Sequence, residues 1–167
     1  YILSLIFCFG LLPSLVAQDA SHPLAHKDLQ AQQIWVDSVY NDMSLEEKVG
    51  QLFMIRAFSD SEKSNQKFVT ELINNYHIGG LIFSTGGPVA QARQSNLYQA
   101  ISKTPLLIGM DAEWGLSMRL DSTYAFPWNM TLGAIADNRL VERTGYHIGE
   151  HCKRIGVHFN FAPVVDI

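Results

Sequence analysis

The sequence predicts an α/β fold, the first half of a (β/α)8 TIM-type barrel that is truncated after about the fourth strand. Short apolar runs alternate with helical patterns along residues 44–162, and such alternation is typical of a parallel sheet with right-handed crossovers. Residues 157–162 alternate large apolar and polar side chains, which suits a barrel strand with a polar inner face. A complete barrel typically needs about 250 residues, so we expect these 167 residues to form its first part.

Two helices are expected before the first strand. The first covers residues 29–43. The second begins with a capping box, in which Ser44 caps the helix and the side chain of Glu47 reaches back to it. That helix leads into an apolar run at residues 52–55, which is the first strand candidate.

Two helix–strand units follow. The helix at residues 65–77 should end at Gly79-Gly80, and residues 81–83 form the second strand. Pro88 should open the next helix, and residues 106–110 form the third strand. The residues expected on the buried face are Phe68, Leu72, Ile73 and Tyr76 in the first helix, and Val89, Ala92, Leu97, Ala100 and Ile101 in the second.

The fourth strand follows a long loop and a long helix. Asp137 should cap a helix that runs to about Ile155, and Gly156 should end it. Residues 157–162 then form the strand, with His158 and Asn160 expected as hydrogen-bonded groups of the barrel interior. The residues expected on the buried face of the helix are Val141, Thr144, Ile148, Cys152 and Ile155.

A Rossmann fold is the competing interpretation. It would require a G-x-G-x-x-G motif directly after a strand, and neither Gly79-Gly80 nor Gly86-Gly87 has that spacing. The sequence also lacks a P-loop, an H-E-x-x-H motif, a G-x-S-x-G motif and clustered cysteines. We therefore expect no metal and no cofactor.

Composition and the N-terminal segment limit the expected partners and location of the protein. The net charge of −4 argues against a nucleic-acid partner, because phosphate binding needs a basic surface. Residues 1–17 are uncharged and predict a signal peptide, cleaved after Ala17 or Ala20, with a linker at residues 18–28. The run is shorter than the about 20 apolar residues of a membrane span, so we expect export without a stable membrane anchor.

The third strand carries the candidate site. Asp111 follows it directly, and Glu113, Trp114 and Arg119 come soon after. The carboxyl ends of barrel strands are where such enzymes bind their ligands. This cluster therefore predicts a site for a polar ligand.

Four segments in order resemble the N-terminal domain of glycoside hydrolase family 3. The Asp-Ala-Glu-Trp-Gly sequence, with Arg119 eight residues beyond Asp111, is most similar to the β-N-acetylhexosaminidase branch. The resemblance covers residues 34–167, which places residues 29–167 in the N-terminal part of such a barrel. The four segments are MSLEEKVGQLFM (residues 43–54), IGGLIF (78–83), LLIGMDAEWG (106–115) and GVHFNFAPVVDI (156–167).

The resemblance implies a secreted or periplasmic retaining enzyme that removes terminal β-N-acetylglucosamine from peptidoglycan or chitin-type oligosaccharides. The family's nucleophile and general acid align beyond Ile167, so no catalytic residue is expected in this chain. Asp111 and Arg119 match the residues that bind the non-reducing terminal sugar. Glu113 is implied to be a supporting group, and the role of Trp114 stays open because the branch commonly has glycine there.

Other interpretations of these residues remain open. Asp111 could instead cap the following turn, and Arg119 could form an ion pair with Glu113. His147 and His151 are four residues apart on a helix, but no third metal ligand is near them in the sequence. At the level of function, another family 3 β-glycosidase acting on glucosides or xylosides is the alternative, or a carbohydrate-binding barrel without catalysis.

Overall fold

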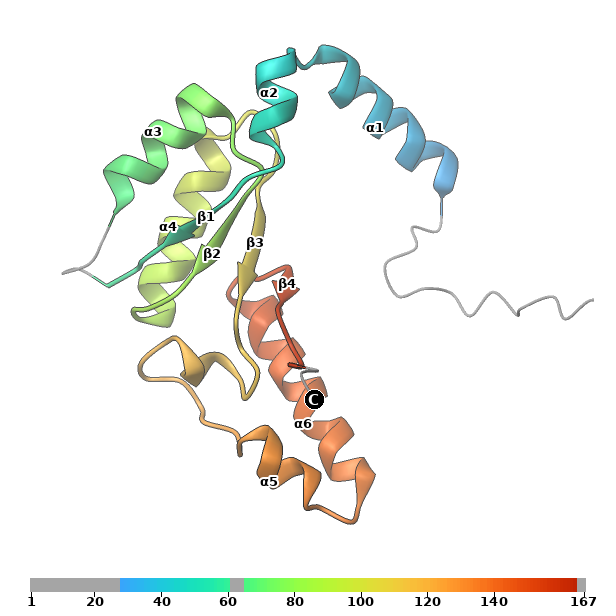
Figure 1. Ribbon diagram of the computed structural model, residues 1–167, viewed down its shortest axis with the longest axis vertical. Coiled ribbons are helices and arrows are strands. Elements are labelled where there is room, and N and C mark those ends of the chain that lie inside the picture. Colours follow the sequence, from blue (N-terminus) through green and yellow to red (C-terminus); the bar gives the residue numbers. More distant parts are fainter. Residues whose placement is uncertain (1–27, 61–64, 165–167) are drawn as a thin grey trace, which may run out of the picture. The chain divides into compact units, whose positions relative to one another are not determined.

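The computed structural model describes residues 28–60 and 65–164 (Figure 1). The predicted signal peptide and nearly all of the predicted linker lie outside the described residues. The chain divides into two compact units, residues 1–38 and 39–167. Helix α1 (Leu29–Asp42) begins in the first unit and matches the predicted helix.

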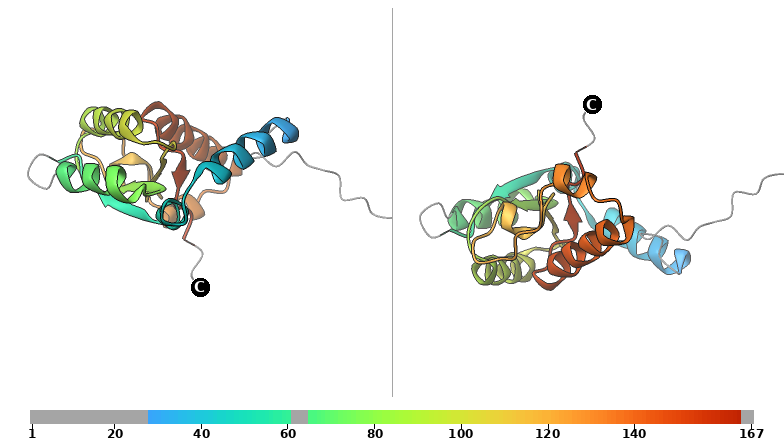
Figure 2. Two further views of the ribbon diagram at one scale, coloured as in Figure 1. Left: turned by 90° about the horizontal axis from the view of Figure 1, so that it is seen from above. Right: turned by 90° about the horizontal axis from the view of Figure 1, so that it is seen from below.

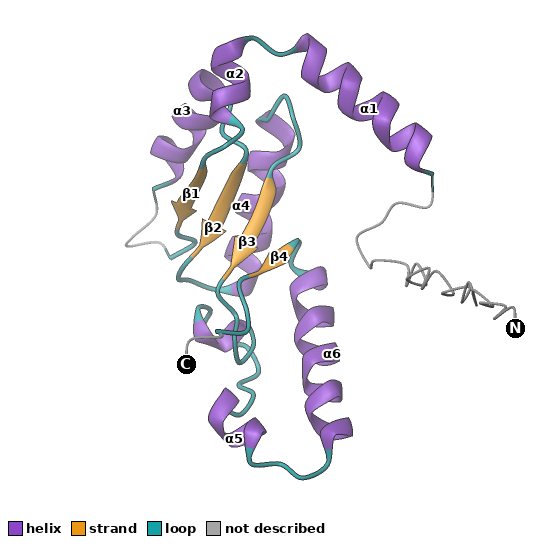
Figure 3. Ribbon diagram, turned by 45° about the vertical axis from the view of Figure 1, so that its right-hand side comes forward, coloured by secondary structure: helices purple, strands orange, loops and turns teal. Residues whose placement is uncertain are grey.

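A parallel sheet of four strands forms the centre of the second unit. The strands are β1 (Met54–Ala57), β2 (Gly80–Phe83), β3 (Leu107–Met110) and β4 (Phe159–Asn160). They lie side by side in sequence order, and each pairs in parallel with the next (Figure 3). This order is that of consecutive strands in a (β/α)8 barrel. The predicted fold class is therefore confirmed.

Three helices connect the strands and pack against one side of the sheet. They are α3 (Gln66–Tyr76), α4 (Pro88–Ile101) and α6 (Asn138–Arg154). Seen from above and below in Figure 2, α3 lies beside α4, in agreement with their direct contacts. The strand side chains on this side form the core with residues of the three helices. The central members are Ala57, Val69, Ile73, Leu81, Phe83, Tyr98, Ile108, Met110, Ile148 and Cys152.

The local start signals in the sequence are confirmed. Ser44 accepts a hydrogen bond from the Glu47 backbone N–H and Glu47 binds the Ser44 N–H, so the capping box begins α2 (Leu45–Gly50). Pro88 is at the first turn of α4. Asp137 caps α6 by accepting a hydrogen bond from the Arg139 N–H. These signals act over three residues or fewer, which is why the sequence shows them.

The end of α3 differs from the prediction. His77, with φ 49°, is the left-handed residue that ends this helix, and Gly80 already belongs to β2. Gly79, which precedes it, instead allows two segments of the chain to approach each other closely. A Cβ atom on Gly79 would lie 2.0 Å from the Gln51 carbonyl oxygen. Gly79 is therefore needed where the chain after α2 crosses the chain after α3.

The predicted buried faces of α3 and α4 are correct at Leu72, Ile73 and Ile101, which lie in the core or pack against it, and wrong at the positions that are exposed. In α3 the buried residues are Val69 and Ile73, while Phe68 and Tyr76 are exposed. In α4 the buried residues are Gln91, Ser95 and Tyr98, and Val89 and Leu97 are exposed. The apolar residues of α4 do not form one narrow stripe, and the large ring of Tyr98 is the one buried against the core. The predicted face of α6 is confirmed at Ile148 and Cys152.

Strand limits and the long loop also differ from expectation. β1 begins at Met54, two residues later than predicted, and β4 covers two residues only. The segment between β3 and α6 contains a short 3-10 helix, η1 (Leu116–Met118), and α5 (Asn129–Gly133), neither of which was predicted. No helix in the described part of the chain is long and apolar enough to cross a membrane.

Candidate functional site

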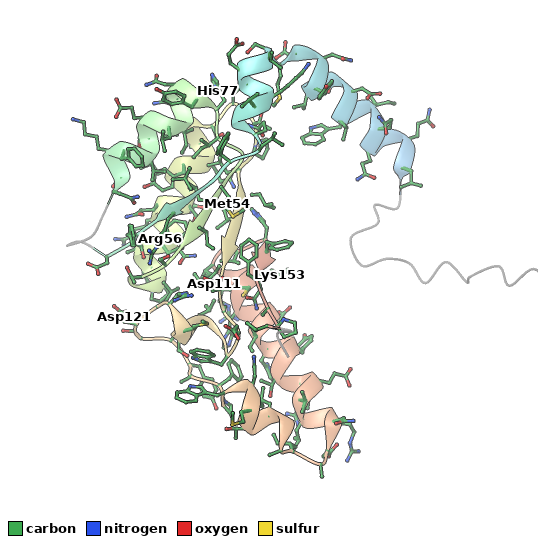
Figure 4. All side chains as sticks on the ribbon, in the orientation of Figure 1. Met54, Arg56, His77, Asp111, Asp121 and Lys153 are labelled. Atoms are coloured by element: carbon green, nitrogen blue, oxygen red, sulfur yellow. The ribbon has the colours of Figure 1, made fainter. Side chains whose placement is uncertain are left out.

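Asp111 lies at the carboxyl end of β3, where the sequence places it. Figure 4 marks it just beyond the last residue of the strand. Its side chain is 37% exposed. Ile108 and Met110 are fully buried against the helices, so alternation along the strand directs Gly109 and Asp111 to the opposite, open face. In a barrel this open face is the interior, and Asp111 therefore lies at its mouth.

Arg119 forms an ion pair with Asp111. The Arg119 Nη2 atom lies 2.7 Å from the Asp111 Oδ2 atom, and the arginine side chain is 29% exposed. The structure thus brings together the two residues that the sequence singled out. The alternative pairing of Arg119 with Glu113 is not the one observed.

The loop that carries Arg119 is tied to the end of β2. The Asp121 N–H donates to the Gly86 carbonyl at 2.9 Å, and Leu120 forms a β-bridge with Gly86. Gly86 has φ 123°, and a Cβ atom there would lie 2.2 Å from the Ser59 Oγ atom. Only glycine fits this junction without strain. The ends of three neighbouring strands therefore hold Arg119 in place.

The ion pair leaves hydrogen-bonding capacity for a ligand. Among the described residues, the Asp111 Oδ1 atom has no hydrogen-bond partner, and the Arg119 Nε atom is buried without one. A carboxylate accepts hydrogen bonds and a guanidinium donates them, both with charge assistance. A half-exposed pair of this kind can bind adjacent hydroxyl groups of one ligand.

Glu113 and Trp114 connect the loop to α5 rather than joining the ion pair. Glu113 Oε2 accepts a hydrogen bond from Asn129 Nδ2 at 3.4 Å. The rings of Trp114 and Trp128 lie 6.0 Å apart at an angle of 46°. These contacts agree with the interpretation of Glu113 as a supporting group and give Trp114 a packing partner.

Arg56 was missed in the sequence analysis. Its neighbour Ala57 is fully buried, so Arg56 lies on the open face of β1. The Arg56 Nε atom donates to Ser84 Oγ at 2.6 Å, and its guanidinium lies 4.9 Å from the centre of the Phe58 ring. A charged residue inside an otherwise apolar strand was the signal that could have identified it.

His158 and Asn160 are hydrogen-bonded, as predicted, but they do not lie in the barrel interior. Both line a hollow against α6, together with Ile148 and Cys152, on the helix-covered side of the sheet. Phe161 lies on the open face instead, since a Cβ atom on Gly109 would lie 2.7 Å from its ring. The absence of a side chain at Gly109 makes room for this ring. Val157 is buried in the core next to the same hollow, so the predicted alternation of faces does not hold along the whole of residues 157–162.

Within the described residues, no group of three His, Cys, Asp or Glu side chains could hold a metal ion. His151 packs against Phe126, with their rings 5.6 Å apart, and His147 packs against Tyr146. Cys152 is buried, and burial raises the pKa of its thiol. Its place in the core is the one expected from the helical pattern.

Most of the chain is similar to a known protein family. Residues 44–167 match the family model described as the glycosyl hydrolase family 3 N terminal domain. The chain belongs to this family. The first curated relative is a β-N-acetylglucosaminidase/β-glucosidase of Cellulomonas fimi, which is 29% identical over 80% of this family 3 chain and 23% of its own length.

Two further relatives carry related names. β-Hexosaminidase A of Pseudoalteromonas piscicida is 31% identical over 59% of the chain and 19% of its own length. A β-hexosaminidase of Thiobacillus denitrificans is 33% identical over 54% of the chain and 28% of its own length. The family 3 chain thus spans about a quarter of the length of its relatives.

A solved structure confirms the fold. The β-glucoside phosphorylase BglX bound to 2FGlc superposes with a TM-score of 0.75 at 21% identity, over 83% of the chain and 24% of that structure. This likeness concerns the fold alone.

Proposed function

We propose that the chain is the N-terminal part of a retaining glycosidase that removes terminal β-N-acetylglucosamine residues from oligosaccharides of the peptidoglycan or chitin type. Family membership and the names of the hexosaminidase relatives support the reaction class and a carbohydrate substrate. The whole protein would be the enzyme, and this chain would contribute one side of its sugar pocket.

The contact between Asp111 and Arg119 is the observation that carries this proposal. Their ion pair lies at the carboxyl end of a barrel strand, where ligands of this fold bind. The carboxylate would accept hydrogen bonds from sugar hydroxyls, and the guanidinium would hold the carboxylate in place and donate its remaining N–H groups. A retaining glycosidase also needs a nucleophile and a general acid, which we expect, from the family resemblance, in segments beyond Ile167.

A kinetic comparison of the full-length enzyme tests the proposal. It should hydrolyse an aryl N-acetyl-β-glucosaminide, and Asp111→Asn should lower kcat/KM by roughly 10- to 100-fold, because hydrogen bonds to a charged group are worth about 1.5–3 kcal/mol. Asp121→Asn is the matched control, because Asp121 is an exposed carboxylate in the same loop. Unchanged kinetics in Asp111→Asn would remove this residue from the pocket.

The name of the Cellulomonas fimi relative supports a second candidate, a β-glucosidase. The same assay with an aryl β-glucoside separates the two. A higher kcat/KM for the glucoside than for the N-acetylglucosaminide would establish the second candidate. Binding of N-acetylglucosamine without turnover of either substrate would indicate a carbohydrate-binding barrel that lacks catalysis.

We also propose that the protein is exported to the periplasm or secreted, on the basis of the uncharged segment at residues 1–17. Mass spectrometry of the mature protein should find residue 18 or 21 at its N-terminus. A mature form that retains residues 1–17 would contradict this.

A further inference from the structure

The pairing of β3 with β4 is irregular next to Asp111. The His158 N–H donates to the Ile108 carbonyl and the Phe161 N–H donates to the Met110 carbonyl, both at 2.9 Å. One residue lies between the two acceptors on β3, whereas two residues lie between the two donors on β4. The extra residue is the arrangement of a β-bulge, which disrupts the regular ladder.

Side chains replace the missing backbone partners on β4. The Ile108 N–H donates to His158 Nδ1 at 3.0 Å. Beyond the last ladder bond, the Ala112 N–H donates to Asn160 Oδ1 at 2.9 Å, and Asn160 Nδ2 donates to the Ala112 carbonyl at 3.1 Å. One side-chain amide therefore forms both hydrogen bonds that a neighbouring strand would have formed with Ala112.

These contacts hold the backbone on both sides of Asp111. Met110, before it, is bound through its carbonyl by Phe161, and Ala112, after it, is bound by Asn160. The Ala112 carbonyl also accepts the Gly115 N–H at 3.1 Å, which begins the turn toward Arg119. Ala112 itself is fully buried. The direction of the Asp111 carboxylate thus depends on a residue 49 positions further along the chain.

A second amide forms the same kind of contact at the other end of β3. Gln99 Oε1 accepts the Leu106 N–H at 2.9 Å, and Gln99 Nε2 donates to the Leu106 carbonyl at 2.8 Å. Leu106 lies just before β3, at the opposite end of this strand from Asp111. Gln99 is therefore a matched reference with equal chemistry and no connection to the site.

We propose that Asn160 is a positioning residue for the sugar-binding pair Asp111–Arg119, through the two hydrogen bonds of its amide to Ala112. The inference rests on the proposed function of that pair. Asn160 itself does not touch the sugar. It holds the peptide that follows Asp111, so that the carboxylate keeps the geometry in which it binds both Arg119 and a hydroxyl group.

The test compares Asn160→Leu with Gln99→Met in the full-length enzyme. Each substitution removes both amide hydrogen bonds at nearly constant side-chain volume. The readout is the inhibition constant of N-acetylglucosamine, because a loss of folded protein lowers kcat but leaves this constant unchanged. We expect Asn160→Leu to raise it by about tenfold, the effect of losing well-placed hydrogen bonds. Gln99→Met should change it by less than about twofold.

A double-mutant cycle with Asp111→Asn shows whether the effect passes through Asp111. If it does, Asn160→Leu added to Asp111→Asn should raise the inhibition constant by less than about twofold further. If Asn160→Leu does not fold, Asn160→Asp replaces it. This variant keeps the acceptor for the Ala112 N–H and loses the donor, and it should raise the constant in the same direction.

The outcomes separate this inference from the proposed function. An unchanged inhibition constant in Asn160→Leu, together with a raised one in Asp111→Asn, would overturn the positioning role alone. Equal increases in Asn160→Leu and Gln99→Met would also overturn it, since the effect would then be general. If Asp111→Asn leaves the constant unchanged, the proposed sugar site itself is wrong.

Discussion

Asp111 and Arg119 could be identified from the sequence, whereas their contact depends on the fold around them. Their eight-residue separation and the apolar strand before Asp111 were visible in the sequence. Their ion pair at 2.7 Å depends on the turn through η1 and on the anchoring of the loop at Gly86. The sequence therefore identified the two residues, whereas Asn160, which fixes the backbone between them, had no signal beyond its place in an alternating pattern.

Tyr98 places a polar hydroxyl group in the apolar core. Its side chain is fully buried, and its hydroxyl group has no hydrogen-bond partner among the described residues. Burial without a partner costs free energy because the hydroxyl loses its hydrogen bonds to water. We expect Tyr98→Phe to raise the free energy of unfolding of the full-length protein by about 1 kcal/mol, measured by urea denaturation at pH 7.

The same variant should alter stability in alkaline solution. Burial raises the pKa of Tyr98 to about 12, from about 10 in the unfolded chain. The folded state then holds the proton more tightly, so this contribution to stability is full below pH 10 and is lost as the pH rises toward 12. Tyr98→Phe should lack this loss. Tyr124→Phe, at an exposed tyrosine, is the control, and equal alkaline profiles for both variants would contradict the assignment.

At the scale of elements, the N-terminus of α2 joins several groups through Glu47. Its carboxylate binds the Ser44 N–H at 2.7 Å and Lys103 Nζ at 3.1 Å, and it lies 3.8 Å from His77 Nε2. The hydrogen bond from the Ser44 backbone, followed by that from Lys103, lowers the pKa of Glu47. A helix cap thus also connects α2 to the segment after α4.

The lowered pKa predicts how this contact responds to acid. A carboxylate with a lower pKa in the folded state stabilises the protein above the ordinary glutamate pKa of about 4.3, and this stabilisation is lost as the pH falls through the lowered value. Glu47→Gln should therefore unfold at a lower temperature than the unmodified protein at pH 7, and the difference should shrink at pH 3. Thermal unfolding measured by circular dichroism gives both values.

Glu71→Gln provides the comparison for this measurement, because Glu71 is exposed on α3. It should change the unfolding temperature little at either pH. A difference between Glu47→Gln and the unmodified protein that stays constant down to pH 3 would show that the ionised carboxylate is not the stabilising group.

At the scale of the whole molecule, the chain supplies neighbouring strands of a barrel and one side of a proposed pocket. A retaining glycosidase needs two catalytic groups, and from the family resemblance we expect both to lie outside this chain. The chain expressed by itself should therefore release no chromophore from an aryl N-acetyl-β-glucosaminide, in an assay where the full-length enzyme is active. Turnover by the isolated chain would show that a catalytic group lies within residues 1–167.

The sequence by itself determined the family, the order of the strands and of the helices α3, α4 and α6 that connect them, the helix starts at Ser44, Pro88 and Asp137, and the candidate pair Asp111 and Arg119. All of these depend on short-range patterns or on motifs within one segment. Only the tertiary structure decided which helix faces are buried, on which side of β4 the polar residues lie, and how Asn160 reaches Ala112. Those features depend on packing between segments that are distant in sequence, and local periodicity carries no information about which neighbour a face will meet.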